Sequence, residues 1–131
     1  MSENTTIIEL EFSSKHSDEG SINDILRIFE THRSLERLTI AGVLQGSNQR
    51  QLKSLLLNNR TIRSLIIKGD TIYSDFGKLI SEGLSENKTL ELLDVSECHV
   101  EFGSILALCD ALTKNTCSVK FDLLVPPPMN R

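Results

Sequence analysis

The apolar residues follow a pattern that recurs along the chain with a period of about 28 residues. Within each recurrence, a short segment reads Φ-x-x-Φ-x-Φ, where Φ is apolar, and a longer segment has apolar residues three or four positions apart. The first spacing is typical of strands and the second of amphipathic helices. We therefore expect strands at 7–12, 35–40, 62–67, 90–95 and 119–123. Helices are expected between them, at about 21–31, 48–57, 74–85 and 102–113.

The strand segments keep a constant phase. Their fourth residues are Leu10, Leu38, Leu65 and Leu93, which are evenly spaced to within a single position, and Phe121 continues the series. A regular period of this kind indicates a repeat architecture in which each unit packs only on its neighbours. The predicted repeats are about 4–31, 32–58, 59–86 and 87–114, with a partial repeat at 115–125. Residues 1–125 would form one repeat domain, followed by a proline-rich tail at 126–131.

A second ladder of residues lies three positions before each predicted strand. Its members are Asn4, His32, Asn59, Asn87 and Asn115. Asparagine bonds nearby backbone groups and tolerates the left-handed conformation, so we expect these residues to end the preceding helices in that conformation. Asn4, Asn59 and Asn87 also read as N-x-T glycosylation sequons, but a helix-to-strand corner explains the same spacing.

With this spacing the sequence resembles the leucine-rich repeat family, specifically the ribonuclease-inhibitor-like type with repeats of about 28 residues. The nearest match to that family's motif is NKTLELLDVS at residues 87–96. The resemblance implies an α/β fold, a right-handed β-α solenoid with five parallel strands on the concave face and four helices on the convex face. The chain departs from the family near the turn that usually holds asparagine, where Gly42, Gly69 and Cys98 stand instead.

Alternation along the strands predicts which side chains face the concave surface. If Leu65 and Ile67 face the core, their neighbours face outward. The candidate partner-binding residues are Arg37, Thr39, Ser64, Ile66, Lys68, Leu92, Asp94 and Ser96. Exposed Ile66 and Leu92 on adjacent strands favour an anchor for a protein partner, although scattered exposed apolar residues are also normal.

Charge suggests a second candidate surface. Arg33, Arg60 and Lys88 share one repeat position just before the strands, so we expect them to align as a basic edge. This edge would suit an acidic partner strip or would simply be solvated. The whole chain has a net charge of −4 and 5% aromatic residues, which disfavours binding of nucleic acid. It contains no apolar run long enough for a membrane span.

Signatures of catalysis and of metal binding are lacking. The sequence has no nucleophile elbow, phosphate loop, dinucleotide fingerprint or zincin motif, so we predict no enzyme, no catalytic residue and no cofactor. The three cysteines show no C-x-x-C spacing, which disfavours a disulfide framework or a zinc knuckle. Cys98 and His99 are adjacent potential ligands, but a metal site needs further ligands, and we predict a turn with a buried cysteine instead.

These observations predict a non-enzymatic protein-interaction module of the cytoplasm. As in the family that it resembles, it would act as an adaptor, regulator or inhibitor and bind an unidentified protein through the concave face and adjacent loops. The alternative is a structural or self-assembling subunit, a homo-oligomer joined through its terminal repeats, because repeat arrays usually end in polar capping units.

Overall fold

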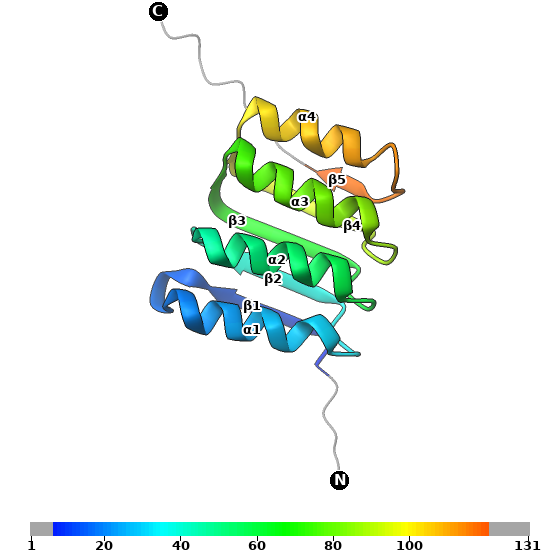
Figure 1. Ribbon diagram of the computed structural model, residues 1–131. Coiled ribbons are helices and arrows are strands. Elements are labelled where there is room, and N and C mark those ends of the chain that lie inside the picture. The colour runs from blue at the N-terminus through cyan, green and yellow to red at the C-terminus, as the bar shows by residue number, and fades with distance from the viewer. Residues whose placement is uncertain (1–6, 121–131) are drawn as a thin grey trace, which may run out of the picture.

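The computed structural model describes residues 7–120, which form one sheet with helices on one of its faces (Figure 1). The strands are β1 (Glu9–Ser13), β2 (Arg37–Ala41), β3 (Ser64–Ile72), β4 (Leu92–Val100) and β5 (Ser118–Lys120). The helices are α1 (Glu19–Thr31), α2 (Gly46–Asn58), α3 (Ser74–Glu86) and α4 (Phe102–Ala111), and a short 3-10 helix, η1 (Ser14–His16), follows β1. The predictions for Asn4, Phe121 and the tail 126–131 lie outside the described residues.

The five strands are parallel and lie in chain order, β1-β2-β3-β4-β5. Register pairing places the repeat leucines in one row, because Leu10 pairs with Leu38, Leu38 with Leu65, and Leu65 with Leu93. Val119 of β5 continues the row. The predicted fold class, an α/β solenoid of five parallel strands and four helices, is confirmed for these residues.

The core lies between the sheet and the helix layer. Six of the strand residues that we expected to face inward are fully buried: Leu38, Ile40, Leu65, Ile67, Leu93 and Val95. Leu10 and Phe12 are only partly buried, because β1 is an edge strand. Full burial of one such aliphatic side chain stabilises the fold by about 1.5–3 kcal/mol before entropy is subtracted.

The strand-to-helix side of each repeat differs most from the prediction. β3 and β4 each run for nine residues and continue beyond the expected ends at 67 and 95. Their pairing contains register shifts between Ile66 and Lys68 and between Lys68 and Thr71. α1 begins earlier than the expected residue 21, because the Asp18 carboxylate is its N-cap and accepts a 2.7 Å hydrogen bond from the Ser21 amide.

The helix-to-strand side is regular, but its geometry is not the one predicted. Asn59 (φ −76°, ψ 142°) and Asn87 (φ −76°, ψ 137°) are extended, so the expected left-handed conformation is wrong there. The positive φ values belong instead to Gly42 (97°) and Gly69 (72°), on the opposite side of the repeats. From this extended backbone, each asparagine side chain bonds a helix that precedes it in the chain.

Each asparagine amide joins two repeats at a site that we call an asparagine corner (Asn59, Asn87 and Asn115). Each Nδ2 group donates to a carbonyl near the C-terminal end of the helix one earlier than the helix that the asparagine follows. The acceptors are Phe29 of α1 at 2.7 Å, Leu56 of α2 at 2.8 Å and Leu84 of α3 at 2.6 Å. The Oδ1 atoms accept from backbone amides of their own repeat, those of Thr61, Ile62, Thr89, Leu90 and Cys117. His32 is a weaker substitute, since its Nδ1 lies 3.4 Å from the Ser34 amide.

Candidate protein-binding surfaces

The predicted binding residues lie on the sheet face opposite the helices, which we call the open sheet face. Within each strand they alternate with the buried residues of the core. The candidate residues of β2 lie directly opposite those of β3, since Arg37 pairs with Ser64 and Thr39 pairs with Ile66. All eight are therefore brought to one face, on three adjacent strands.

Exposure separates these residues into groups. Arg37 is exposed and approaches Glu9 of β1, with 3.6 Å between Nη2 and Oε1. Thr39 is only 5% exposed, because Glu11 and Ile66 flank it in register on the neighbouring strands. A partner cannot use Thr39 as a contact, so it is removed from the candidate surface. The remaining six residues are half-buried.

Ile66 and Leu92 form the apolar part of the open sheet face. They are not directly opposite each other: Ile66 pairs with Asp94, and Leu92 pairs with Ser64. The two aliphatic side chains are therefore diagonal neighbours, which lie about 7–8 Å apart in a sheet. Both keep part of their surface accessible, so together they provide one small apolar contact area among polar groups.

Charged residues lie beside this apolar area. Asp94 pairs in register with Lys120 of β5, and Lys68 lies farther along β3. Partial burial raises the pKa of Asp94, but hydrogen bonds from Ser96 and the charges of Lys120 and Lys68 outweigh this effect and lower the pKa below its usual value. Asp94 is thus a carboxylate at neutral pH, and its Oδ1 accepts from the Ser96 amide at 2.9 Å and hydroxyl at 2.6 Å.

Asp70 is a buried ionisable residue that the sequence analysis missed. It is 4% exposed, and its two carboxylate oxygens accept from the Thr71 amide at 2.8 Å and from the Leu44 amide of the preceding repeat at 3.2 Å. Burial raises the pKa of Asp70, although these two hydrogen bonds oppose the change. Its repeat phase was a usable signal, because Asp70 follows Ile67 by three residues as Cys98 follows Val95.

Cys98 lies within β4 and not in a turn, and its role is structural. The thiol donates to the Ile67 carbonyl at 3.1 Å. Burial raises the pKa of Cys98 to about 11, so the thiol is neutral at pH 7 and is a poor metal ligand. His99 beside it is exposed. Across residues 7–120, no three His, Cys, Asp or Glu side chains are grouped as a metal site.

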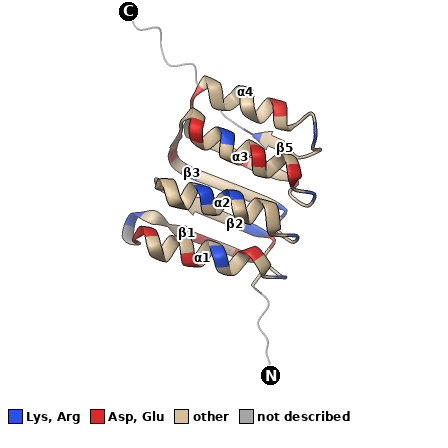
Figure 2. Cartoon of the chain, in the orientation of Figure 1, with Lys and Arg blue, Asp and Glu red and all other residues tan. Residues whose placement is uncertain are grey.

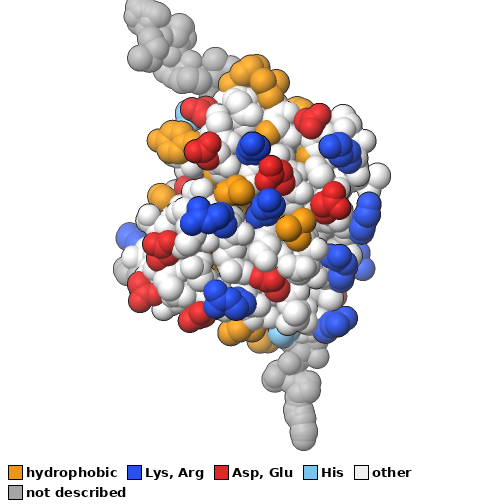
Figure 3. All heavy atoms as spheres, in the orientation of Figure 1, with side chains coloured by type: hydrophobic (Ala, Val, Ile, Leu, Met, Phe, Trp, Pro, Cys, Tyr) orange, Lys and Arg blue, Asp and Glu red, His pale blue; other side chains and the backbone are white. Residues whose placement is uncertain are grey.

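Basic side chains gather along the edge formed by the helix-to-strand loops. Arg33, Arg60 and Lys88 are exposed in three successive loops, as the shared repeat position predicts, and Lys114 adds a fourth cation after α4. Figure 2 shows basic residues in the loops beyond the ends of the helices, and Figure 3 shows basic side chains along one side of the molecule from α1 to α4. We call Arg33, Arg60, Lys88 and Lys114 the corner cations.

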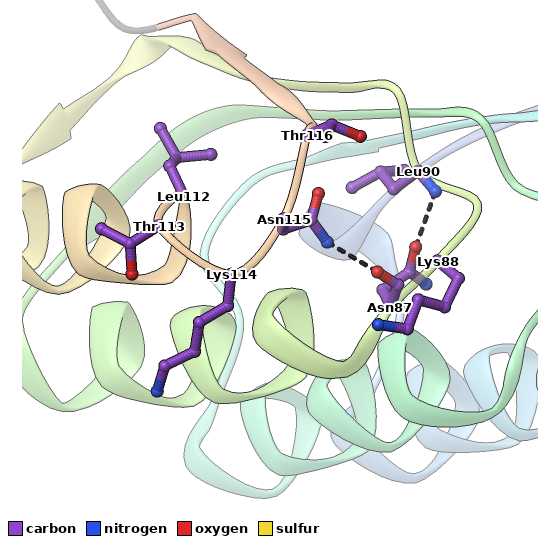
Figure 4. Close-up of a pocket in the computed structure, with 8 residues that line it drawn as sticks. All are labelled: Asn87, Lys88, Leu90, Leu112, Thr113, Lys114, Asn115 and Thr116. Atoms are coloured by element: carbon purple, nitrogen blue, oxygen red, sulfur yellow. Dashed lines mark hydrogen bonds between the residues drawn. The ribbon is translucent and has the colours of Figure 1, made fainter.

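A hollow of about 410 Å³ lies at one end of this edge, between the last two asparagine corners. Figure 4 shows Lys88 and Lys114 with Leu90, Leu112 and the two corner asparagines around it. Asn115 donates to the Asn87 carbonyl, and Asn87 accepts from the Leu90 amide. Because the asparagines are engaged by the backbone, the polar groups left for a ligand are mainly the lysines and threonines of the lining.

The last helix presents apolar side chains to solvent. Phe102 is 69% exposed and Leu106 is 56% exposed, and one helical turn separates them. Tyr73, just before α3, is also largely exposed. α1, at the other end of the array, exposes Ile28 beside Asp24 and Arg27. Among the helices in residues 7–120, none is long and apolar enough to cross a membrane.

Comparison with known proteins shows the fold and not the family. No protein-family model matches the chain, and a search of curated proteins found no similar sequence. Among solved structures, the chain is similar to the tropomodulin C-terminal domain of Caenorhabditis elegans, with a TM-score of 0.76, 11% identity, and coverage of 95% of this chain and 78% of that chain. It is also similar to the leiomodin-1 actin-binding site 2, with a TM-score of 0.73, 17% identity, and coverage of 88% and 71%.

Proposed function

We propose that this protein is a non-enzymatic protein-interaction module that binds a protein partner through the open sheet face and the loops beside it. The observation that carries the proposal is the accessible pair Ile66 and Leu92, bordered by Arg37, Lys68 and Asp94, on a sheet face that the helices leave open. Apolar anchors with a charged rim are typical of protein-binding surfaces. The role would be that of an adaptor, regulator or inhibitor in the cytoplasm.

The size of the open sheet face limits how it is used. Five strands at about 4.8 Å spacing, each contributing about 20 Å of length, give on the order of 400 Å². A stable protein interface uses about 800 Å² per partner. A partner that binds tightly must therefore also contact the neighbouring loops or the basic edge.

The fold neighbours suggest which partner to test first. One of them is described as an actin-binding site, and we propose actin as the first candidate for this chain. We also propose that the repeats are of the ribonuclease-inhibitor-like type. The regular period of the sequence and the helices of 13 residues in the first three repeats support this assignment.

Co-sedimentation with filamentous actin, together with affinity capture from a cell lysate, tests the proposal. The test variant is Ile66→Thr with Leu92→Thr, because threonine removes apolar surface and still suits a strand. The matched control is Ile28→Thr, which removes an exposed aliphatic group from α1. Circular dichroism and thermal unfolding must first show that each variant is folded.

We expect the double variant to bind the partner at least about tenfold more weakly, as is usual when interface anchors are lost. The control should bind like the wild type. Equal binding by all three proteins would contradict the use of the open sheet face. If the protein captures a partner from the lysate but does not bind actin, the proposed protein-interaction module is supported and actin is excluded as its partner.

Self-assembly through the terminal repeats is the second candidate function, and the exposed face of α4 supports it. Phe102 and Leu106 resemble the residues that bury one repeat against the next, and a second copy would cover them. Light scattering between one and one hundred micromolar is the test, with Phe102→Glu as the variant. A mass that rises with concentration in the wild type but not in the variant supports assembly. A constant monomer mass contradicts it.

A further inference from the structure

Some basic residues on the surface are paired with carboxylates, and in the described part of the chain the corner cations are among those that are not. Arg27, Arg37, Lys53 and Arg63 each form an ion pair with a carboxylate at 2.8 to 3.6 Å. None of the four corner cations has such a pair with a carboxylate of residues 7–120. Their charge is therefore available to an external anion, as is that of Lys15, Arg50, Lys68, Lys78 and Lys120. What distinguishes the corner cations is that they lie together along one edge.

The row is partly preorganised. The Arg60 guanidinium donates from Nη1 to the Leu57 carbonyl at 3.0 Å and to the Asn59 carbonyl at 3.1 Å, at the C-terminal end of α2. These bonds hold one cation of the row in place, and Arg60 remains exposed. Backbone carbonyls carry no net charge, so the positive charge of Arg60 is not cancelled.

The repeat geometry gives the row a spacing that an extended peptide matches. Successive repeats are about 4.8 Å apart at the sheet and about 8–10 Å apart at the helix axes, and the corner loops lie between these layers. In an extended chain, alternate side chains point the same way and lie about 6.6 Å apart. One carboxylate at every second peptide position would therefore meet Arg33, Arg60 and Lys88 in turn, because these three share one repeat position, and Lys114 lies beyond Lys88 at the hollow.

The hollow at the end of the row adds an apolar component. Leu112, which is half-buried, and Leu90, which is buried, lie in the lining together with Lys88 and Lys114. A small anion would leave this apolar surface unused, and a purely acidic peptide would also do so. A peptide with an aliphatic residue beside its acidic stretch would fill the hollow and pair with both lysines.

We propose that the corner cations and the hollow form a docking groove for an extended acidic segment of a partner protein. The segment carries carboxylates at alternate positions and an aliphatic side chain that enters the hollow between Lys88 and Lys114. This surface is separate from the open sheet face, and the inference does not rest on that face binding anything.

Fluorescence anisotropy with a synthetic probe tests the inference. The probe is a labelled peptide with glutamate at alternate positions and one leucine at its end, and the counter-probe has glutamine in place of every glutamate. The test variant is Lys88→Glu with Lys114→Glu. The matched control is Lys78→Glu with Lys15→Glu, which makes the same change of charge at exposed sites on α3 and in η1. Glu86→Gln removes an acidic group beside the row.

We expect the acidic probe to bind the wild type more weakly as salt increases, and the test variant to lose about tenfold or more in affinity. The control should stay within about twofold of the wild type, since charges beyond a Debye length are screened. Glu86→Gln should bind about twofold more tightly, because it removes a like charge from the path of the peptide.

Several results would overturn the inference. One is equal binding of the glutamine counter-probe, and another is an equal loss of affinity in the control variant. A third is that vesicles of phosphatidylcholine and phosphatidylserine, or a single-stranded oligonucleotide, bind through Lys88 and Lys114 while the acidic peptide does not. Loss of actin binding in the Ile66 and Leu92 variant would leave the inference untouched, so the two proposals can fail separately.

Discussion

Each repeat of this protein turns at two corners, and the two are built in different ways. At the helix-to-strand corner, three asparagines make similar backbone hydrogen bonds, through Nδ2 to the end of an earlier helix and through Oδ1 to the amides that follow them. On the strand-to-helix side, the structure changes from repeat to repeat: Gly42 follows β2 at φ 97°, whereas Asp70 and Cys98 lie within the long ends of β3 and β4. A regular corner needs one side chain of suitable shape, whereas an irregular corner depends on its particular neighbours.

The irregular corners still join neighbouring repeats, but with opposite hydrogen-bonding roles. Asp70 accepts from the Leu44 amide of the preceding repeat, and Cys98 donates to the Ile67 carbonyl of the preceding repeat. The two residues occupy the same repeat position, three residues after Ile67 and Val95. One position therefore tolerates an acceptor or a donor, provided that the backbone beside it offers the matching group.

The largest loss of stability is expected from a substitution that removes an asparagine corner. Asn87→Ala would leave the Leu56 carbonyl and the Thr89 and Leu90 amides without their partner in a buried site. Each unsatisfied buried group costs about 1–3 kcal/mol, so the free energy of unfolding should fall by about 3 kcal/mol or more. Urea denaturation followed by circular dichroism measures this change.

Asn58→Ala is the matched control for that substitution. Asn58 is the last residue of α2, is exposed, and bonds through Nδ2 to the Ser54 carbonyl and the Glu30 carboxylate. Its loss should lower the free energy of unfolding by less than about 1 kcal/mol. Similar losses in the two variants would show that the asparagine corners are not special.

An intermediate effect is expected at the irregular corner from Gly42→Ala. Alanine at φ 97° is strained, and its Cβ would also clash with the Ser14 hydroxyl. We expect a loss of about 1–2 kcal/mol in the free energy of unfolding. Gly46→Ala, at the start of α2, is the control, since a Cβ there meets only the end of the Arg50 side chain at 3.8 Å. Thermal unfolding should rank the two variants in this order, and the reverse order would refute the strain argument.

The smallest change in stability is expected from ionisation of Asp70, and this change depends on pH. Because the folded-state pKa of Asp70 is raised, the folded protein holds this proton more tightly than the unfolded chain does. The contribution of Asp70 to stability is therefore fully present below the unfolded pKa of about 3.9 and is lost as pH rises through the folded pKa. Asp70→Asn cannot titrate, so its stability relative to the wild type should increase across this window.

Measuring urea denaturation of both proteins at several pH values isolates this contribution, because the other carboxyl groups are common to both. Asp18, Glu82, Asp94 and Glu101 have lowered pKa values and act in the opposite direction, so the curve of the wild type alone would not reveal it. A difference between the two proteins that does not change with pH would mean that Asp70 is not destabilised by burial of its charge.

The same contrast between corners explains what the sequence predicted. The leucine row and the asparagine corners recur at one spacing, so the strands, helices and parallel sheet could be derived from periodicity. The long ends of β3 and β4 could not, because their pairing depends on register shifts that no apolar pattern reveals. The backbone conformation at Asn59 and Asn87 was also predicted wrongly, since asparagine suits both a left-handed cap and an extended corner.

The candidate surfaces were predicted less completely than the fold. Alternation placed Arg37, Ile66 and Leu92 on the open sheet face, but it could not show that Thr39 is covered by its neighbours on both sides. The shared phase located Arg33, Arg60 and Lys88, whereas Lys114 stands at a different repeat position and joins them only in the folded chain. Surface contacts arise from side-chain lengths and neighbours, which a pattern of apolar positions does not encode.

The asparagine corners also give the array a direction. Each amide reaches back to a helix that precedes it in the chain: Asn59 to α1, Asn87 to α2 and Asn115 to α3. A corner can therefore be completed only after the earlier helix has formed, which is the order in which a ribosome delivers them. Removing repeats from the C-terminal end exposes helix carbonyls, whereas removal from the N-terminal end exposes the amide of an asparagine that has lost its helix partner. The molecule is thus suited to being built from its first repeat onward.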